Sequence, residues 1–120
     1  MIKVIPMEYD YIFGINISNK LEKNDIQLLA TVTEEKLKSY DQLRMYVEVE
    51  NFRGTTPSGV LEDFKFGCRY RNVYYKKVIV CKELWLGMLT VFASKTVYTN
   101  MDIKHFYWQE KDQALEWIKN

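Results

Sequence analysis

The chain contains few of the residues that most often build catalytic and metal sites. Its 120 residues include one histidine, His105, and two cysteines, Cys68 and Cys81. A metal site usually needs several His, Cys or carboxylate ligands at close spacing, and a nucleophilic site needs a base beside its nucleophile. No recognisable nucleophile motif accompanies His105, which we expect to be a hydrogen-bonded residue of a strand. These absences predict a protein that is not an enzyme and holds no metal and no cofactor.

An excess of charge of one sign is also missing. Seventeen basic and 16 acidic side chains leave a net charge of +1, whereas nucleic-acid binding needs a clustered positive surface. No stretch approaches the roughly 20 apolar residues of a membrane span, and the first residues lack the apolar run of a signal peptide. Two cysteines are too few for a disulfide framework, so we expect two buried thiols in a reducing compartment. Together these points predict a cytoplasmic protein with no nucleic-acid partner.

The composition and the length favour one folded domain. Hydrophobic residues make up 48% of the chain and aromatic residues 15%, which is enough for a substantial core. At 120 residues the chain fits a single domain, residues 1–120, and is too short for two. It contains no repeats, no low-complexity tracts and no linker.

The spacing of apolar residues changes repeatedly between the strand period of two and the helix period of 3.6. This alternation predicts an α/β fold with a five-stranded, mostly parallel sheet and four helices in the order ββαβαβαβα. In the second helix we expect Val60, Leu61, Phe64 and Cys68 to form the buried stripe. The expected strands span residues 2–7, 11–17, 43–50, 78–81 and 103–108. The first expected helix is capped by Asn24 or Asp25 and the second by Thr56, and the last two begin at about residues 83 and 112.

The segment 43–60 has the pattern of a strand, a short loop and a helix start. In wound α/β sheets such loops lie at the carboxyl ends of the strands, where ligands bind. Thr56 as N-cap and Pro57 as first helical residue are an ordinary way to begin a helix. Thr55, Thr56 or Ser58 could also hold a polar ligand group or a phosphate, because a helix amino end favours negative charge. The structural and the functional interpretation are compatible.

The expected third helix, residues 83–93, is apolar around most of its circumference, although a surface helix needs only one apolar face. The apolar side chains beyond that one face need something else to bury them, which could be a neighbouring helix, an apolar ligand, a membrane surface or a second subunit. The sequence leaves open whether the protein is a monomer or a homodimer. We expect Trp85 and Phe92, with Phe52, to border a cleft near the carboxyl ends of the strands. The apolar side chains of this segment are Leu84, Trp85, Leu86, Met88, Leu89, Val91 and Phe92.

Short sequence motifs spread along nearly the whole chain occur in an order typical of one family. They are Asn24-Asp25, Leu43-Arg44, Val47-Glu48, Phe52-x-Gly54, Asp63, Phe66-Gly67, Val78-Ile79-Val80, Trp85, Phe92, Phe106 and Ala114-x-x-Trp117-Ile118. In this pattern the chain resembles the SpoIIAA-like group of STAS domains. These proteins are related to bacterial anti-sigma-factor antagonists and are likened to CRAL-TRIO lipid-binding domains.

The resemblance implies a STAS-type fold and a non-enzymatic role, with an apolar ligand or a membrane surface as the leading partner. Ser58 occupies a place similar to the phosphorylated serine of STAS antagonists, but Pro57 stands where those proteins have an acid or a serine. The alternative is therefore a signalling or scaffold domain that binds a protein partner and is controlled by phosphorylation at Ser58 or Thr56. The candidate ligand-binding residues are Phe52, Thr55, Thr56, Ser58, Trp85 and Phe92.

Overall fold

The structure is a computed structural model, in which residues 1–82 and 101–120 are described. The described residues form five strands, three α-helices and one short 3-10 helix. Their bounds are β1 (Ile2–Ile5), β2 (Ile12–Leu21), α1 (Lys23–Lys36), β3 (Leu43–Thr55), α2 (Pro57–Arg69), β4 (Tyr74–Cys81), β5 (Asp102–Tyr107), the short 3-10 helix η1 (Trp108–Glu110) and α4 (Lys111–Lys119).

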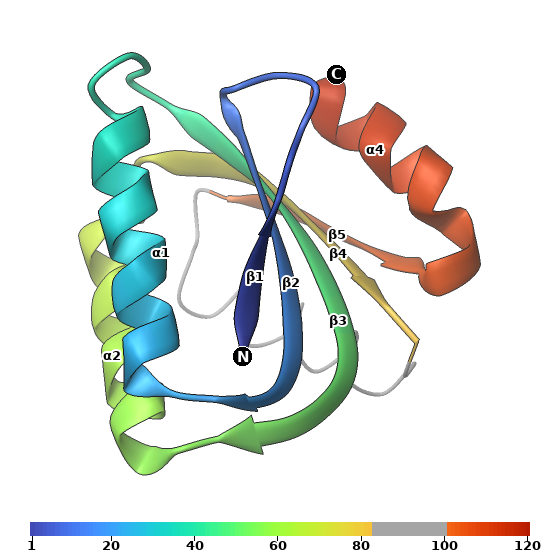
Figure 1. Cartoon of the computed structure of the whole chain (residues 1–120). Helices are drawn as coiled ribbons and strands as arrows, with labels where there is room; N and C mark the ends of the chain where they lie inside the picture. The colour runs from blue at the N-terminus through green and yellow to red at the C-terminus, as the bar shows by residue number, and fades with distance from the viewer. Residues whose placement is uncertain (83–100) are drawn as a thin grey trace.

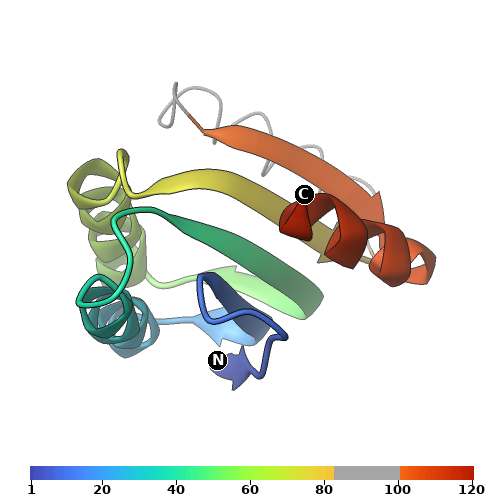
Figure 2. The ribbon, with the colours of Figure 1, turned by 90° about the horizontal axis from the view of Figure 1, so that it is seen from above.

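The five strands form one sheet in the order β1-β2-β3-β4-β5. Strand β1 is antiparallel to β2, and the other neighbouring pairs are parallel. Helices α1 and α2 cover one face of the sheet and α4 covers the other (Figures 1 and 2). The predicted α/β class and the mostly parallel five-stranded sheet are therefore confirmed.

The helix count and the element order differ from the prediction. Within residues 1–82 and 101–120 the order is ββαβαββα, with three α-helices and η1. The helix expected at residues 83–93 lies outside the described residues. None of the helices in the described part combines the length and the hydropathy that a bilayer-spanning segment needs.

Two apolar clusters hold the layers together. Met45, Val47 and Ile79 belong to the cluster under α1 and α2. Their strand neighbours Tyr46 and Val78 point to the opposite face and belong to the cluster under α4. Strands β3 and β4 are thus covered on both faces, which explains the continuous apolar run 78–81.

The N-cap of helix α1 lies two or three residues before the predicted caps, Asn24 or Asp25. This N-cap is Glu22, whose backbone N–H donates to Asp25 Oδ2 at 2.8 Å. The other oxygen of the same carboxylate accepts from the backbone N–H of Ile2 at 3.2 Å. Asp25 therefore closes the first turn of α1 and also ties that turn to β1.

Strand β3 is longer than predicted. It runs on to Thr55 instead of ending at residue 50, and its end pairs with β2 through Leu21 and Thr55. Asn51 and Gly54 in this stretch have φ angles of 52° and 99°. Register shifts interrupt the pairing there, as in a β-bulge. The expected loop is therefore the irregular end of a strand.

The start of α2 confirms the predicted cap. The hydroxyl of Thr56 accepts a hydrogen bond from the backbone N–H of Gly59 at 3.0 Å, and Pro57 is the first helical residue. Gly59 is buried, and a Cβ atom there would lie 2.9 Å from the carbonyl oxygen of Leu21. This close approach fixes which face of α2 turns inward.

The predicted buried stripe of α2 is wrong. Val60, Leu61 and Phe64 are 57%, 54% and 58% exposed. Cys68 is also exposed, so only Cys81 of the two expected buried thiols is buried. The inward face carries two small residues and one ring, and the buried residues of α2 are Gly59, Phe66 and Gly67.

Candidate ligand pocket

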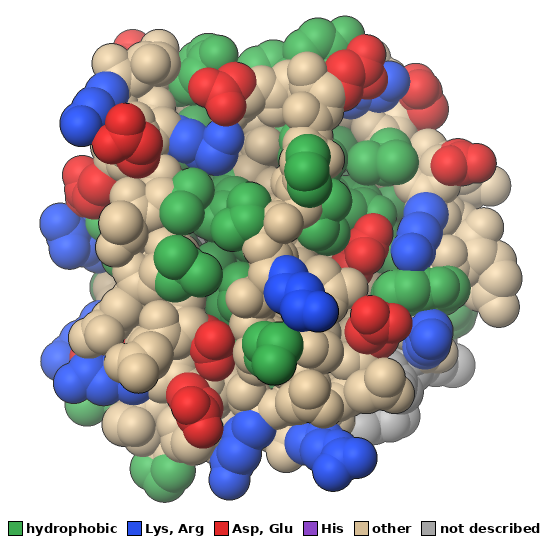
Figure 3. Space-filling view, in the orientation of Figure 1, with side chains coloured by type: hydrophobic (Ala, Val, Ile, Leu, Met, Phe, Trp, Pro, Cys, Tyr) green, Lys and Arg blue, Asp and Glu red, His purple; other side chains and the backbone are tan. Residues whose placement is uncertain are grey.

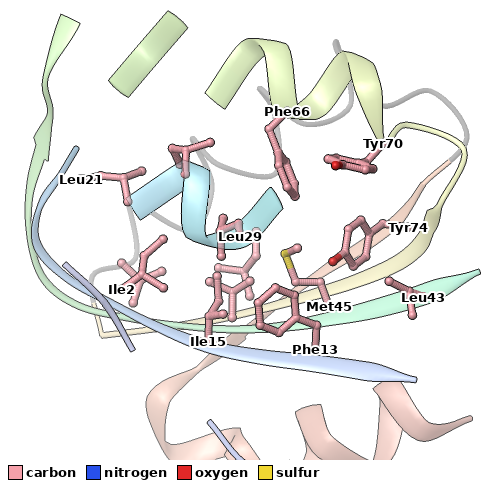
Figure 4. Packing of buried hydrophobic residues seen from close by; sticks show 14 of the residues in the cluster. Ile2, Phe13, Ile15, Leu21, Leu29, Leu43, Met45, Phe66, Tyr70 and Tyr74 are labelled. Carbon is pink, nitrogen blue, oxygen red and sulfur yellow. The ribbon is translucent and has the colours of Figure 1, made fainter. Parts of the chain in front are cut away.

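An apolar pocket lies between the sheet and the helix pair α1 and α2. Its volume is about 200 Å³. The pocket interrupts the apolar cluster of Figure 4, where side chains from the strands point toward those of the helices. The described residues that line it are Ile2, Ile15, Ile17, Leu21, Ile26, Leu29, Met45, Val47, Val49, Phe52, Thr55, Asp63, Phe66, Tyr70, Tyr74, Lys77, Ile79 and Met101.

Strand alternation supplies the floor of the pocket. Because side chains alternate between the two faces of a strand, Met45, Val47 and Val49 of β3 all point toward the helices. Leu29 of α1 and Phe66 of α2 contribute from the helix side. The floor and the roof are therefore apolar.

The tyrosines of the wall already have polar partners. The phenol of Tyr74 is 2.7 Å from the hydroxyl of Thr33, which itself donates to the carbonyl of Leu29. The phenol of Tyr70 donates to Glu34 at 2.7 Å. Burial raises the pKa of Tyr74 well above its usual value, and burial together with the bond to Glu34 raises the pKa of Tyr70 to about 12. Both phenols therefore stay neutral at neutral pH.

One acid and one amine also line the pocket. Asp63 comes from α2, and Lys77 comes from β4, where it is paired in register with Met45. Asp63 as a whole residue is exposed, yet burial of its carboxyl raises its pKa, and the charge of Lys77 opposes that rise. Burial lowers the pKa of Lys77, and the charge of Asp63 opposes that fall. The two groups therefore stabilise each other's charged forms in apolar surroundings.

The residues proposed from the sequence are only partly brought together here. Phe52 and Thr55 line the pocket. Thr56 is occupied as the cap of α2, and Ser58 is exposed, with its hydroxyl 3.5 Å from that of Thr56. Trp85 and Phe92 lie outside the described residues.

The sequence patterns did not predict Asp63 and Lys77 as pocket residues. Local patterns place Asp63 on the outer face of a helix and Lys77 among solvated charges at the start of a strand. The register of β4 instead brings Lys77 to the pocket, and Asp63, although exposed as a whole residue, also lines it. Only the alternation of Lys77 with Ile79 on one face of β4 could have indicated the position of the lysine.

A second polar cluster lies on the α4 side of the sheet. The carboxylate of Glu48 accepts from the phenol of Tyr46 at 2.8 Å and from Asn16 at 3.3 Å, and it pairs with Lys111 at 3.8 Å. Glu50 also accepts from Asn16 at 3.3 Å and pairs with Lys82 at 3.7 Å. Each carboxylate is thus neutralised by its own lysine, as in a structural network. Within the described residues no group of three or more His, Cys, Asp or Glu side chains is placed to hold a metal.

Cys81 and His105 form a thiol–imidazole contact, with Sγ and Nε2 3.0 Å apart. Such a distance is typical of an activated cysteine, but Cys81 is fully buried. Burial lowers the pKa of His105, which favours the neutral ring, and Glu110 opposes that shift. The contact accords with the hydrogen-bonded strand histidine expected from the sequence.

The face of the molecule over α1 and β1 carries interspersed acids and bases (Figure 3). Several of these charges form ion pairs, such as Lys36 with Asp10 at 3.2 Å and Lys38 with Glu35 at 3.0 Å. Among the described residues of this face, basic side chains therefore alternate with acidic ones.

Comparisons with known proteins agree on the fold. The family model described as SpoIIAA-like matches residues 12–119. The structure is similar to the crystal structure of an uncharacterised protein with a SpoIIAA-like fold from Shewanella loihica PV-4, with a TM-score of 0.79 and 17% sequence identity. The match covers 98% of this chain and 92% of that one. A search of curated proteins found no match.

Proposed function

This chain belongs to the SpoIIAA-like family and has a STAS-type fold, and we propose that it is a non-enzymatic binding module for a small apolar ligand or a lipid. The ligand would occupy the pocket between the sheet and the pair α1 and α2. The observation that carries the proposal is the pocket itself, with its apolar lining and its two charged groups.

The size and the lining support a small ligand. Ligand pockets are mostly apolar and contain a few polar groups that orient the ligand. At about 200 Å³ the pocket is comparable with an apolar cavity of roughly 150 Å³ that binds benzene. A ring or a medium-length alkyl chain would therefore fit, whereas a whole phospholipid would leave most of its length outside.

The first test uses the native protein. Native mass spectrometry and solvent extraction would detect an apolar molecule that co-purifies, and titration with the uncharged dye Nile red would report an available pocket. We expect saturable fluorescence enhancement at one site per chain. Absence of both a co-purified ligand and saturable dye binding would contradict the proposal.

A pair of matched variants assigns the dye to the pocket. Val49 lines the pocket, whereas Val4 is 51% exposed on β1. Val49→Phe should fill part of the pocket and weaken dye binding about tenfold or more, and Val4→Phe should leave it unchanged. If the two variants bind the dye equally well, the dye is bound elsewhere.

A second candidate function rests on the outer face of α2. Val60, Leu61 and Phe64 are exposed beside Ser58, and such a stripe could contact a membrane surface, a protein partner or a second copy of the chain. Regulation by phosphorylation of Ser58 or Thr56 would act at this surface. Vesicle flotation, size-exclusion chromatography and phosphate analysis of the protein from cells would test these partners. If Phe64→Ser abolishes an association seen with the wild type, the stripe is the contact surface. If the association is unchanged, the stripe is not the contact surface.

A further inference from the structure

The polar part of the pocket wall is a carboxylate and an amine that share one apolar space. Within the described residues, Asp63 and Lys77 are the only acid and the only base that line the pocket. They approach from opposite layers, Asp63 from α2 and Lys77 from β4. The charge of each shifts the pKa of the other, so the two groups are electrostatically coupled across the pocket.

We infer that the pocket selects an uncharged amphiphile, whose apolar part fills the space and whose hydroxyl or amide group meets Asp63 and Lys77 together. This inference rests on the proposed function and adds the ligand class. A carboxylate is an acceptor and an ammonium is a donor. A hydroxyl or a primary amide has both capacities and can therefore bond to both residues at once.

Charge explains the discrimination. A ligand with a carboxylate head would gain attraction from Lys77 but would bring its charge beside Asp63. A ligand with an ammonium head would meet the reverse conflict at Lys77. Like charges brought together in apolar surroundings are costly. A neutral head avoids both conflicts.

The inference does not require either residue to be unpartnered. An ammonium has three donors and a carboxylate about four acceptor positions. Lys77 can therefore keep a bond within the protein and still donate to the ligand. The phenols of Tyr70 and Tyr74 are committed to Glu34 and Thr33, which leaves Asp63, Lys77 and Thr55 as the described polar groups of the wall.

The experiment compares three probes with the same eight-carbon chain, namely 1-octanol, octanoate and octylammonium. Each probe competes with Nile red for the wild-type protein at neutral pH. We expect 1-octanol to displace the dye at a concentration about tenfold lower than either charged probe. This ranking is measured on the wild type alone, so it does not depend on the folding of any variant.

Two neutralising substitutions should then shift the ranking in opposite directions, each bringing one charged probe close to 1-octanol. Asp63→Asn should lower the octanoate concentration that displaces Nile red about tenfold, because it removes the like charge. The concentration needed for octylammonium should stay the same or rise. Lys77→Met should lower the octylammonium concentration that displaces the dye by a similar factor and should not improve displacement by octanoate. Circular dichroism and urea unfolding would establish that both variants are folded.

The outcomes separate this inference from the proposed function. If Nile red binds but the three probes compete equally well, the ligand does not meet the charged pair, and the inference fails while the proposed function stands. If both substitutions leave the order of the probes unchanged, the inference fails in the same way. If neither the dye nor any probe binds the wild type, the proposed function fails as well.

Discussion

Arg44 joins three parts of the chain with a single side chain. Its guanidinium lies over the rings of Tyr11 and Tyr75 and donates to the Tyr75 hydroxyl and to the carbonyl of Ile118. Lys76 donates to the preceding carbonyl of the same helix, that of Trp117, at 2.9 Å. Carbonyls at the end of a helix lack partners within the helix, and cations there are favourable. These two side chains therefore hold the last turn of α4 against the starts of β3 and β4.

We predict that Arg44→Ala lowers the free energy of unfolding by about 2 kcal/mol, which is typical of hydrogen bonds to a charged group. Arg44→Lys should recover only part of the loss, because an ammonium cannot stack and donate in two directions as a guanidinium does. Urea unfolding would measure both changes, with Lys3→Ala on exposed β1 as the control. Equal stability of wild type and Arg44→Ala would show that α4 does not depend on this contact.

At the scale of the element, the start of α2 separates two neighbouring hydroxyls. Thr56 caps the helix through Gly59, whereas Ser58 is exposed. Thr56→Ala should cost about 1 kcal/mol of unfolding free energy, as is usual for the loss of an N-cap. Ser58→Ala should change stability by less than about 0.5 kcal/mol. Thermal or urea unfolding would distinguish them, and a larger loss in Ser58→Ala than in Thr56→Ala would contradict this assignment.

The two faces of α2 make a second element-scale prediction. Phe64 is 58% exposed and Phe66 is 9% exposed. Phe66→Ala should cost about 3 kcal/mol, the lower end for a buried ring because Phe66 borders a pocket. Phe64→Ala should cost less than about 0.5 kcal/mol. The opposite order in urea unfolding would mean that Phe64 is the buried ring, as the sequence pattern predicts.

This helix also shows where sequence reasoning fails. The pattern of large apolar residues predicts that Val60, Leu61 and Phe64 face the core. The inward face instead contains the buried glycines Gly59 and Gly67, and at Gly59 the backbone of Leu21 approaches too closely for a larger side chain. A periodicity argument gives weight to large side chains and gives none to glycine. It therefore selects the wrong stripe on a helix that has two candidates.

For the whole molecule, alternation along the strands was sufficient to predict the fold class. The continuous apolar run 78–81 correctly indicated a strand covered on both faces, and the alternating run 43–50 correctly indicated a strand. The pocket was less predictable. Asp63 and Lys77 resemble solvated charges in any short window, and only the register of β4 and the orientation of α2 bring both to the lining of one pocket.

The buried tyrosines predict how stability depends on alkaline pH. Burial raises the pKa of Tyr46, Tyr70 and Tyr74, and that of Tyr70 to about 12. An unfolded tyrosine ionises near pH 10, so above that pH the unfolded state binds fewer protons than the folded state. The free energy of unfolding should therefore be constant up to about pH 9 and fall as the pH rises from 10 toward 12. Urea unfolding at several pH values, with tyrosinate absorbance as a second signal, would measure this, and constant stability through pH 11.5 would contradict it.

The most direct test of the account is to observe where an apolar molecule binds. Methyl NMR spectra recorded during titration with 1-octanol would compare the two faces of the sheet. Ile15, Ile79 and Met45 line the pocket, whereas Ile12, Val78 and Val80 belong to the cluster under α4. We expect saturable shifts in the first three and small, non-saturating shifts in the second three. Absence of saturable shifts at Ile15, Ile79 and Met45, or saturable shifts centred on the α4 face, would contradict the assignment of this pocket as the ligand site.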